Sequence, residues 1–399
     1  MMTAIYTISS ALHDQQAVKA ATKEFLDSLH LENVEFRGED FSRYGSSGLD
    51  LIYVCTGGTE GIFLQLLDEL LGKSDRPFYL LTSGKSNSLA ASMEILSYLR
   101  QKGMRGEILH GPLAYVSKRI RLLQKLWEVK SALVGQRLGV LGSPSDWLIS
   151  SAADSDAIQR RLGMKTVQIP MDEVMEALER ASAVIPDGMV ADGEIKEALP
   201  GAYRIYMALR EVVEKHNLQG FTLRCFDLLT AVHNTGCLAL ARLNAEGIVA
   251  GCEGDVPALV SMMVAKAVTG VSGFQANPAN IDLDKGEITF AHCTIPLNMV
   301  EHYELDTHFE SGIGVGIRGF MKPGPVTVLK VSGDLSRYFV AEGSLVENMA
   351  RPNLCRTQQV IRLNDKQQCR YFLTNPIGNH HVILPGHHQE LICEVLDNQ

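Results

Sequence analysis

Several side chains that bind metals or move protons stand beside glycines and strand-like runs in the second half of the sequence. Glu253 follows the apolar run 248–250 and lies between two glycines. Asp255 comes next, directly ahead of a Val-Pro pair, as an N-cap does at the start of a helix. The carboxyl end of a buried strand is where open α/β sheets bind ligands. Glu253 is therefore either a capping carboxylate or a metal ligand and general base.

Three further stretches place polar side chains where strands begin or end. They are His292 ahead of a proline, the trio Asp306, His308 and Glu310 ahead of the glycine-rich run 312–319, and the pair His380 and His381. One histidine is more often a core or surface group than a ligand, and this alternative stays open for His292. A glutamate and several histidines from separated strands would suit Mn²⁺, Fe²⁺ or Co²⁺.

Composition limits the class of protein. A chain of 399 residues is expected to form two or three domains. Its net charge of -9 argues against a nucleic-acid partner, and no run approaches the roughly 18 apolar residues of a membrane span. The eight cysteines are scattered without a CxxC pair, as is usual for reduced thiols. With no basic region ahead of an apolar run at the start, we expect a cytoplasmic protein without a membrane partner.

Hydrophobic patterning predicts two α/β domains with parallel, Rossmann-like sheets, followed by a β-rich, barrel-like domain. Strand, small polar loop and helix repeat along 1–130, and the pattern restarts in a central domain, 131–275, which carries Glu253. After about residue 270, helical periodicity is scarce. Short strand-like segments with turn residues between them are typical of an antiparallel sheet or barrel, here 276–399.

Two loops of the first domain, TGGTEG at 56–61 and TSGKSNS at 82–88, lead from strands into helices. Their backbone N–H groups could hold an anion or sugar hydroxyls. Neither loop has the spacing of a P-loop or of a dinucleotide motif. The alternative is a turn that needs glycine for its backbone angles.

The order of four short motifs resembles the L-fucose isomerase and L-arabinose isomerase superfamily. The motifs are EGD at 253–255, HC ahead of Pro296, DTH at 306–308, and NHHV at 379–382. The resemblance covers most of the chain in architecture, and its specific motifs lie within 247–384. It implies that family's three-part fold, two α/β domains and a β-rich end.

The resemblance also implies roles for single residues. Glu253 corresponds to the metal-binding, acid/base glutamate, His380 to the C-terminal metal histidine with His381 as an alternative, and His308 to a further metal histidine. Asn277 stands where the fucose branch has an aspartate ligand, and it keeps an amide oxygen for a metal. No acid follows His292, so Asp306 is expected as the second catalytic residue, with Glu310 as its alternative.

The activity implied is aldose–ketose isomerisation of an open-chain sugar through an enediol, with a divalent metal, Mn²⁺ first. The substrate is expected to be a hexose or a 6-substituted hexose, such as a deoxy- or sulfo-sugar. The resemblance further implies a homo-oligomer in which N-terminal loops complete a neighbour's site. The expected substrate-binding residues are Thr82, Lys85, Ser86, Asn87, His292 and His381. Two alternatives stay open: an inactive sugar-binding or regulatory protein, and another metal-dependent enzyme on small hydroxy-carbonyl compounds.

Overall fold

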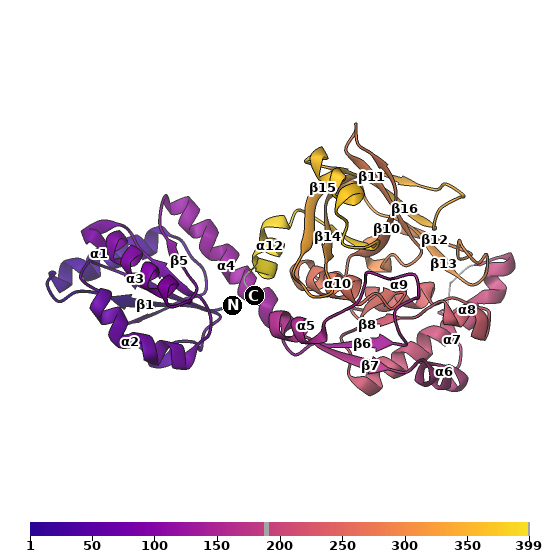
Figure 1. The fold of residues 1–399 in the computed structure, drawn as a ribbon, viewed down its shortest axis with the longest axis horizontal. Helices are drawn as coiled ribbons and strands as arrows, with labels where there is room; N and C mark the ends of the chain where they lie inside the picture. The colour runs from indigo at the N-terminus through magenta and orange to yellow at the C-terminus, as the bar shows by residue number, and fades with distance from the viewer. Residues whose placement is uncertain (187–190, 398–399) are drawn as a thin grey trace. The chain divides into compact units, whose positions relative to one another are not determined.

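The computed structural model describes residues 1–186 and 191–397, and it divides into two compact units, Met1–Glu128 and Val129–Gln399 (Figure 1). It confirms the α/β class, with two parallel sheets and an antiparallel barrel at the C-terminal end. The further division of the second unit at residue 275 stays a proposal, because the sheet and the barrel lie in one compact unit.

The first unit is a five-stranded parallel sheet with the strand order β2-β1-β3-β4-β5. Its strands are β1 (Thr3–Ile8), β2 (Val34–Gly38), β3 (Leu49–Val54), β4 (Phe78–Leu81) and β5 (Gly106–Leu109). Every residue of β1, β3 and β4 is buried, which explains their nearly continuous apolar runs. The sequence analysis did not predict β5, a four-residue strand that begins with glycine and glutamate.

Four α-helices connect or follow these strands. They are α1 (Gln15–Ser28), α2 (Glu60–Lys73), α3 (Ser88–Gln101) and α4 (Leu113–Leu133), with the short 3-10 turns η1 (Phe41–Arg43) and η2 (Lys85–Asn87). The Asp14 carboxylate caps α1 by accepting hydrogen bonds from the N–H groups of Gln16 and Ala17. The order of the strands reverses between β1 and β3, so the loops after these two strands lie on either side of a topological switch point.

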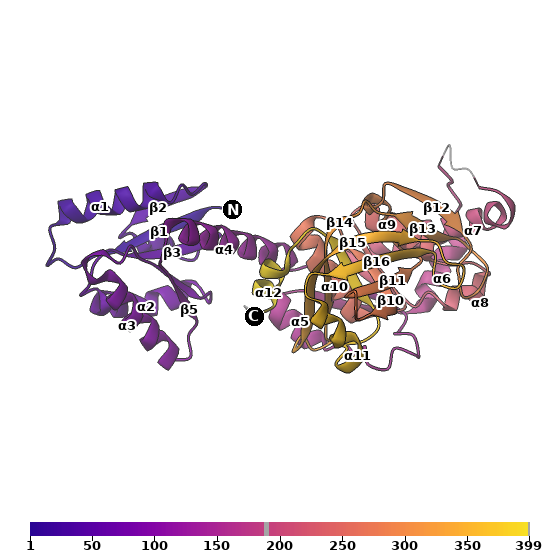
Figure 2. The same ribbon diagram turned by 90° about the horizontal axis from the view of Figure 1, so that it is seen from above.

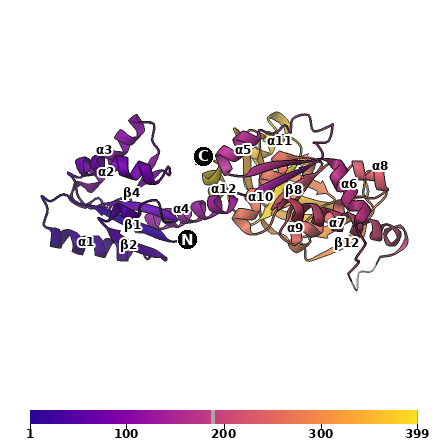
Figure 3. The same ribbon diagram turned by 90° about the horizontal axis from the view of Figure 1, so that it is seen from below.

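The second unit begins with a four-stranded parallel sheet in the order β7-β6-β8-β9. The strands are β6 (Arg137–Leu141), β7 (Lys165–Ile169), β8 (Gly220–Leu223) and β9 (Val249–Cys252). Its helices are α5 (Ser155–Leu162), α6 (Met171–Arg180), α7 (Gly193–His216), α8 (Asp227–Val232), α9 (Cys237–Ala245) and α10 (Val256–Thr269). Helices α6 and α7 pack side by side (Figure 3). The sequence analysis missed α5, whose N-cap is Asp154.

The chain then forms a closed six-stranded barrel in the order β10-β11-β16-β15-β14-β17, with every pairing antiparallel (Figure 2). Its strands are β10 (Phe274–Asp282), β11 (Glu287–His292), β14 (Gly324–Val331), β15 (Tyr338–Met349), β16 (Thr357–Leu363) and β17 (His381–Pro385). The remaining elements are the hairpin β12 (His302–Asp306) and β13 (Gly316–Phe320), the turns η3 (Leu297–Met299) and η4 (Lys366–Arg370), and the helices α11 (Tyr371–Thr374) and α12 (Gln389–Asp397).

Helix α10 joins the sheet to the barrel. It contacts β8 and β9 on the sheet and β14 and β17 on the barrel, and residues 256–265 are all buried. This placement explains why the helix is apolar on nearly every face. One continuous core runs from Phe221 and Ala250 of the sheet to Phe274, Phe290 and Ile383 of the barrel. The start of α10 is therefore held against strands from both layers.

Among the helices that the structure describes, none is both long and apolar enough to cross a membrane.

Candidate active site

The turn between β9 and α10 holds Glu253 in a left-handed backbone conformation. Its φ is +64°, and that of Gly254 is +70°. A Cβ at Gly254 would lie 2.4 Å from the carbonyl oxygen of Ser143, so only glycine fits there. Asp255 caps α10 as predicted, because its Oδ1 accepts the N–H of Ala258 at 2.9 Å. Glu253 is thus fixed at a strand end in a conformation that non-glycine residues rarely adopt.

Glu253 lies with two histidines from the barrel. One ligand atom from each of Glu253, His292 and His380 falls within 4.8 Å of the other two. Glu253 Oε1 is 3.4 Å from His380 Nε2 and 3.8 Å from His292 Nε2. All three residues are buried, and they come from the end of β9, the end of β11 and the position before β17. One oxygen and two nitrogen donors face a common point.

His380 has one ring nitrogen bound and the other without a partner. Its Nδ1 lies 2.9 Å from Asp255 Oδ2, while its Nε2 is buried and has no hydrogen-bond partner in the described part of the chain. A buried nitrogen left unpaired beside a carboxylate is costly unless something binds it. Burial opposes protonation, but the hydrogen bond to Asp255 and the negative charge of Glu253 raise the pKa of His380 to about 9. A bound cation would take the place of that proton.

The second oxygen of Glu253 is held by Trp147. The indole Nε1–H donates a hydrogen bond of 2.6 Å to Glu253 Oε2, and the indole ring meets the Phe226 ring edge-on. Burial raises the pKa of Glu253, but the two nearby histidines, His292 and His380, outweigh burial and hold that pKa well below its usual range. The carboxylate is therefore ionised, with one oxygen fixed and the other turned towards the histidines.

The sequence analysis expected His292 to bind substrate and left open whether it is a ligand or a core residue; in the structure it joins Glu253 and His380. Its Nδ1 lies 3.0 Å from the hydroxyl of Thr294, which leaves Nε2 turned towards Glu253. The His292 and His380 rings meet at a centroid distance of 5.5 Å. The signal in the sequence was the HC pair at a strand end, but a single histidine there did not distinguish a metal ligand from a core residue.

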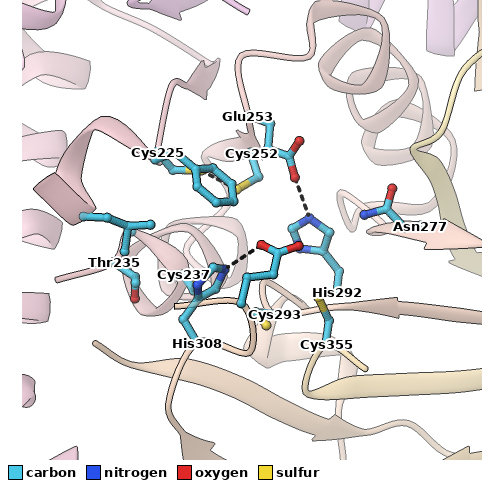
Figure 4. Close-up of a pocket in the computed structure, with 14 residues that line it drawn as sticks. Cys225, Thr235, Cys237, Cys252, Glu253, Asn277, His292, Cys293, His308 and Cys355 are labelled. Carbon is cyan, nitrogen blue, oxygen red and sulfur yellow. Dashed lines mark hydrogen bonds and ion pairs between the residues drawn. The ribbon is translucent and has the colours of Figure 1, made fainter. Parts of the chain in front are cut away.

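A pocket opens beside this group (Figure 4). Five cysteines with no clustering in the sequence line it: Cys225, Cys237, Cys252, Cys293 and Cys355. The sulfur atoms of Cys225 and Cys252 are 3.0 Å apart, and all eight cysteines of the chain are free thiols. Phe226 and Leu229 add apolar surface. The pocket therefore has walls of thiols and apolar side chains, and the ionised Glu253 lies at one end.

Asn277, His308 and Glu310 also line the pocket. Two of them, Asn277 and His308, were predicted metal residues, and they lie near the metal-binding group but do not belong to it. His308 has its Nδ1 3.0 Å from the hydroxyl of Ser311 and its Nε2 3.6 Å from Glu310 Oε2. Burial lowers the pKa of His308 to about 4. Burial and the charge of Glu253 raise the pKa of Glu310.

Asp306, the predicted second catalytic residue, is engaged elsewhere. Its Oδ2 lies 2.6 Å from Arg318 and 3.4 Å from Arg356, and its Oδ1 accepts the N–H of Thr307. It is not among the described residues that line the pocket. Its oxygens are occupied by cations and a backbone donor, so we do not propose Asp306 as the acid/base residue. Glu310, its alternative, has the better position.

His381 is a packing residue. Its Nδ1 faces the carbonyl oxygen of Asn379 at 2.9 Å, and its Nε2 faces the hydroxyl of Tyr371 at 3.1 Å. The rings of Phe339, Phe372 and Tyr371 surround it, and burial lowers its pKa to about 3. Both nitrogens are bound within the protein, so the structure favours His380 for the metal and leaves His381 without a free nitrogen for a substrate.

The other predicted substrate residues belong to the first unit. Thr82 is buried and donates its hydroxyl hydrogen to Ser88 Oγ, whereas Lys85, Ser86 and Asn87 are exposed. Ser86 and Asn87 have φ values of +53° and +58°. These residues form the strand-to-helix turn that the sequence predicted, and their role in binding stays a prediction.

Comparison with known proteins matches part of the chain to sugar isomerases. Residues 152–270 match the model of the L-arabinose isomerase central domain. A sulfoquinovose isomerase of Priestia aryabhattai is 22% identical over 249 residues, which is 57% of this chain and 55% of the relative. One from Clostridium sp. (strain MSTE9) is 26% identical over 181 residues, 42% of this chain and 38% of the relative. The matches span about half the length of these curated relatives or less.

Proposed function

The chain belongs to the superfamily of L-arabinose and L-fucose isomerases, and we propose that it is a divalent-metal-dependent aldose–ketose isomerase of an open-chain sugar. The observation that carries the proposal is the buried group of Glu253, His292 and His380, with an unpaired His380 nitrogen facing the carboxylate. It stands at one end of a pocket that also contains an acid and an amide, Glu310 and Asn277.

The donor set fits a divalent ion. Two imidazole nitrogens and one carboxylate oxygen suit Mn²⁺, Fe²⁺ or Co²⁺, and we propose Mn²⁺ first. Three protein ligands leave open positions for a substrate, as catalytic metal sites require. Asn277 lines the same pocket and offers an amide oxygen from β10. When bound, such an ion would polarise the oxygen atoms on C1 and C2 of the sugar and so make the C2 hydrogen more acidic.

We propose Glu310 as the residue that moves the proton. As a carboxylate it takes the hydrogen from C2 as a proton, the electrons of that bond form the C1–C2 double bond, and the C1 carbonyl electrons move to O1, which gains a proton. The O2 hydroxyl then loses its proton, the C2 carbonyl forms, and the electrons of the C1–C2 double bond take the proton back from Glu310 at C1. Its side chain is 53% exposed, next to His308, so it can exchange protons with solvent. Glu253 is less suited, because Trp147 and the two histidines hold its oxygens and keep it ionised.

We propose the substrate class from the names of the relatives. Because the relatives are named sulfoquinovose isomerases, we place a 6-sulfo hexose first and a 6-deoxy hexose second. No lysine or arginine is among the described residues that line the pocket, and Arg318 is paired with Asp306. An anionic C6 group would need a cation from elsewhere, such as Lys85 in a homo-oligomer. We also propose that the enzyme works in the cytoplasm, in keeping with its free thiols.

The test is an exchange assay with added Mn²⁺ that follows solvent deuterium into C1 or C2 of a panel of aldoses, including 6-sulfo and 6-deoxy hexoses. Metal-dependent incorporation into one sugar, with formation of its ketose, is the expected result. Stabilisation by a sugar without any exchange would favour a binding protein. Bound metal with no response to any sugar would favour a different reaction on hydroxy-carbonyl compounds.

A further inference from the structure

A lysine with no exposed surface lies behind the candidate metal group. Lys330 stands on β14, a strand of the barrel, and its side chain and that of Asp255 are both fully buried. Burying an ammonium group is costly unless a carboxylate pairs with it. Lys330 Nζ is 3.4 Å from Asp255 Oδ2, which supplies that pairing. Neither residue lines the pocket, so Lys330 has no direct contact with a substrate there.

The backbone fixes Lys330 in this place. The N–H of Val331 donates a hydrogen bond of 3.1 Å to Ser261 Oγ on α10, which ties β14 to the helix that Asp255 caps. On the other side, β14 pairs with β17, with Leu329 opposite Val382. Lys330 therefore lies between the start of α10 and the strand that follows His380.

Asp255 connects this lysine to the metal group. Its Oδ1 accepts the N–H of Ala258, and its Oδ2 faces both Lys330 Nζ and His380 Nδ1. A carboxylate on the Nδ1–H of a histidine fixes the ring so that Nε2 presents its lone pair to a metal. That Nε2 is the unpaired nitrogen beside Glu253.

The charges require a permanent cation behind Asp255. A histidine that binds a metal ion through Nε2 is a neutral imidazole. His380 would then supply no positive charge to Asp255, and the buried carboxylate would have Lys330 as its direct ion-pair partner in the described structure. Removing Lys330 would leave an uncompensated buried charge on Asp255, the residue that holds the ring of His380.

We infer that Lys330 is a positioning residue for the metal site: its ammonium group holds Asp255 in place as a carboxylate, and Asp255 holds His380 with Nε2 towards Glu253 and His292. The inference rests on the proposed metal-dependent function. It assigns Lys330 no contact with the metal or the sugar.

The test measures Mn²⁺ binding by titration calorimetry, without any sugar. Lys330→Met is expected to bind Mn²⁺ about 10–100-fold more weakly than the unaltered protein, the range seen when outer-shell partners of metal ligands are removed. The control is Lys266→Met, at the far end of α10, where the ammonium contacts the carbonyl oxygen of Gly247. It should bind Mn²⁺ normally. Equal affinity in Lys330→Met and the unaltered protein would overturn the inference.

A second pair of variants tests the inference even if Lys330→Met does not fold. Asp255→Asn removes the charge that needs compensation and keeps an oxygen for His380, so Asp255→Asn and Asp255→Asn/Lys330→Met should bind Mn²⁺ within about twofold of each other. A further large loss in the double variant would show that Lys330 acts independently of Asp255, contrary to the inference. Failure of the unaltered protein to bind any divalent ion would overturn the inference together with the metal-dependent function, whereas failure of isomerisation alone would leave the inference standing.

A spectroscopic measurement separates positioning from a general loss of stability. In protein loaded with Zn²⁺, a diamagnetic probe, ¹⁵N spectra of labelled histidine rings should show His380 with its proton on Nδ1. Lys330→Met should broaden or split that signal, while Lys266→Met should leave it unchanged. An unaltered His380 signal in Lys330→Met would contradict the inference, because a purely structural lysine would not affect the ring.

Discussion

Two strand-to-helix turns stand at the carboxyl ends of the two parallel sheets, after β4 in the first unit and after β9 in the second. Both contain polar residues and positive φ angles. After β4, Lys85, Ser86 and Asn87 are exposed. After β9, Glu253 and Asp255 are buried and contact groups from β14 and from the ends of β11 and β17. The turn after β9 forms a buried ionic site because strands of the barrel in the same unit cover it. Within the first unit, nothing comparable covers the exposed residues of the turn after β4.

The same contrast holds for two buried aspartates. Burial raises the pKa of Asp50 on β3 to about 6, since hydrogen bonding from Gly45 and the charge of Arg76 only partly offset it. Burial also opposes ionisation of Asp255, but the charge of Lys330 and the hydrogen bond from His380 lower its pKa to about 2. A buried carboxylate is kept ionised by a cation at bonding distance, not by burial or strand position.

The largest effect on activity is expected for Glu253→Gln. The amide keeps the shape of the side chain but removes the charge that faces the two histidines, so turnover should fall by at least about 10²–10⁴-fold with the fold retained. Deuterium exchange measures turnover, and circular dichroism checks the fold.

The matched control is Glu94→Gln at an exposed position on α3 in the first unit. It should leave turnover unchanged. Near-normal deuterium exchange by Glu253→Gln would show that the turn after β9 takes no part in the reaction.

The second prediction ranks two acids, Asp306 at the end of β12 and Glu310 in the loop that follows it. Glu310→Gln should lower turnover by about 10²-fold or more and leave Mn²⁺ binding within a few-fold, because Glu310 lines the pocket outside the metal group. Asp306→Asn should act mainly on stability, since it breaks the pairs with Arg318 and Arg356. The reverse pattern, a lost reaction in Asp306→Asn only, would restore Asp306 as the acid/base.

Much of this architecture could be predicted from the sequence, and the reasons are local. The apolar run before Glu253 and the Asp-Val-Pro that follows it give the strand, the turn and the capped helix directly. Strand β10 was missed because its sequence, FQANPANID, has four polar residues and a proline and lacks a long apolar run. Its antiparallel partners β11 and β17 determine its conformation, and they lie far along the chain.

The missed site residues are those whose role depends on long-range contacts. Trp147 lies in a loop after β6, more than one hundred residues from the carboxylate it binds. The sequence left open whether His292 is a ligand or a core residue, and only the pairing of the barrel strands brings it close to His380. Lys330 did leave a signal, a single cation inside the apolar strand GPVTVLKV, but its partner Asp255 could not be identified from spacing.

The third prediction tests the backbone of the β9 turn. Gly254→Ala should lower the free energy of unfolding by about 1–3 kcal/mol or more, because the added Cβ would meet Ser143 O at 2.4 Å in a positive-φ conformation. Gly270→Ala, at the C-cap of α10, shares a positive φ but has no atom within 4 Å of the new Cβ, so it should cost only about 1 kcal/mol. Urea unfolding measures both. Equal losses would mean that Ser143 yields and that the turn is not tightly packed.

The smallest effect is expected for Asp50→Asn, and its sign depends on pH. The pKa of Asp50 in the fold, about 6, lies above its unfolded value of 3.8, so the side chain favours folding fully below pH 3.8 and loses that contribution as the pH rises through 6. Asparagine does not titrate and keeps an oxygen for the N–H of Gly45. Relative to the unaltered protein, Asp50→Asn should therefore gain up to about 1–3 kcal/mol between pH 4 and pH 7, as measured by hydrogen exchange of the β1 and β3 amides. Asp68→Asn, at an exposed position on α2, is the control and should show no such gain. A gain that is the same at pH 4 and pH 7 would mean that Asp50 is ionised in the fold throughout, and the contrast with Asp255 would then lose its electrostatic cause.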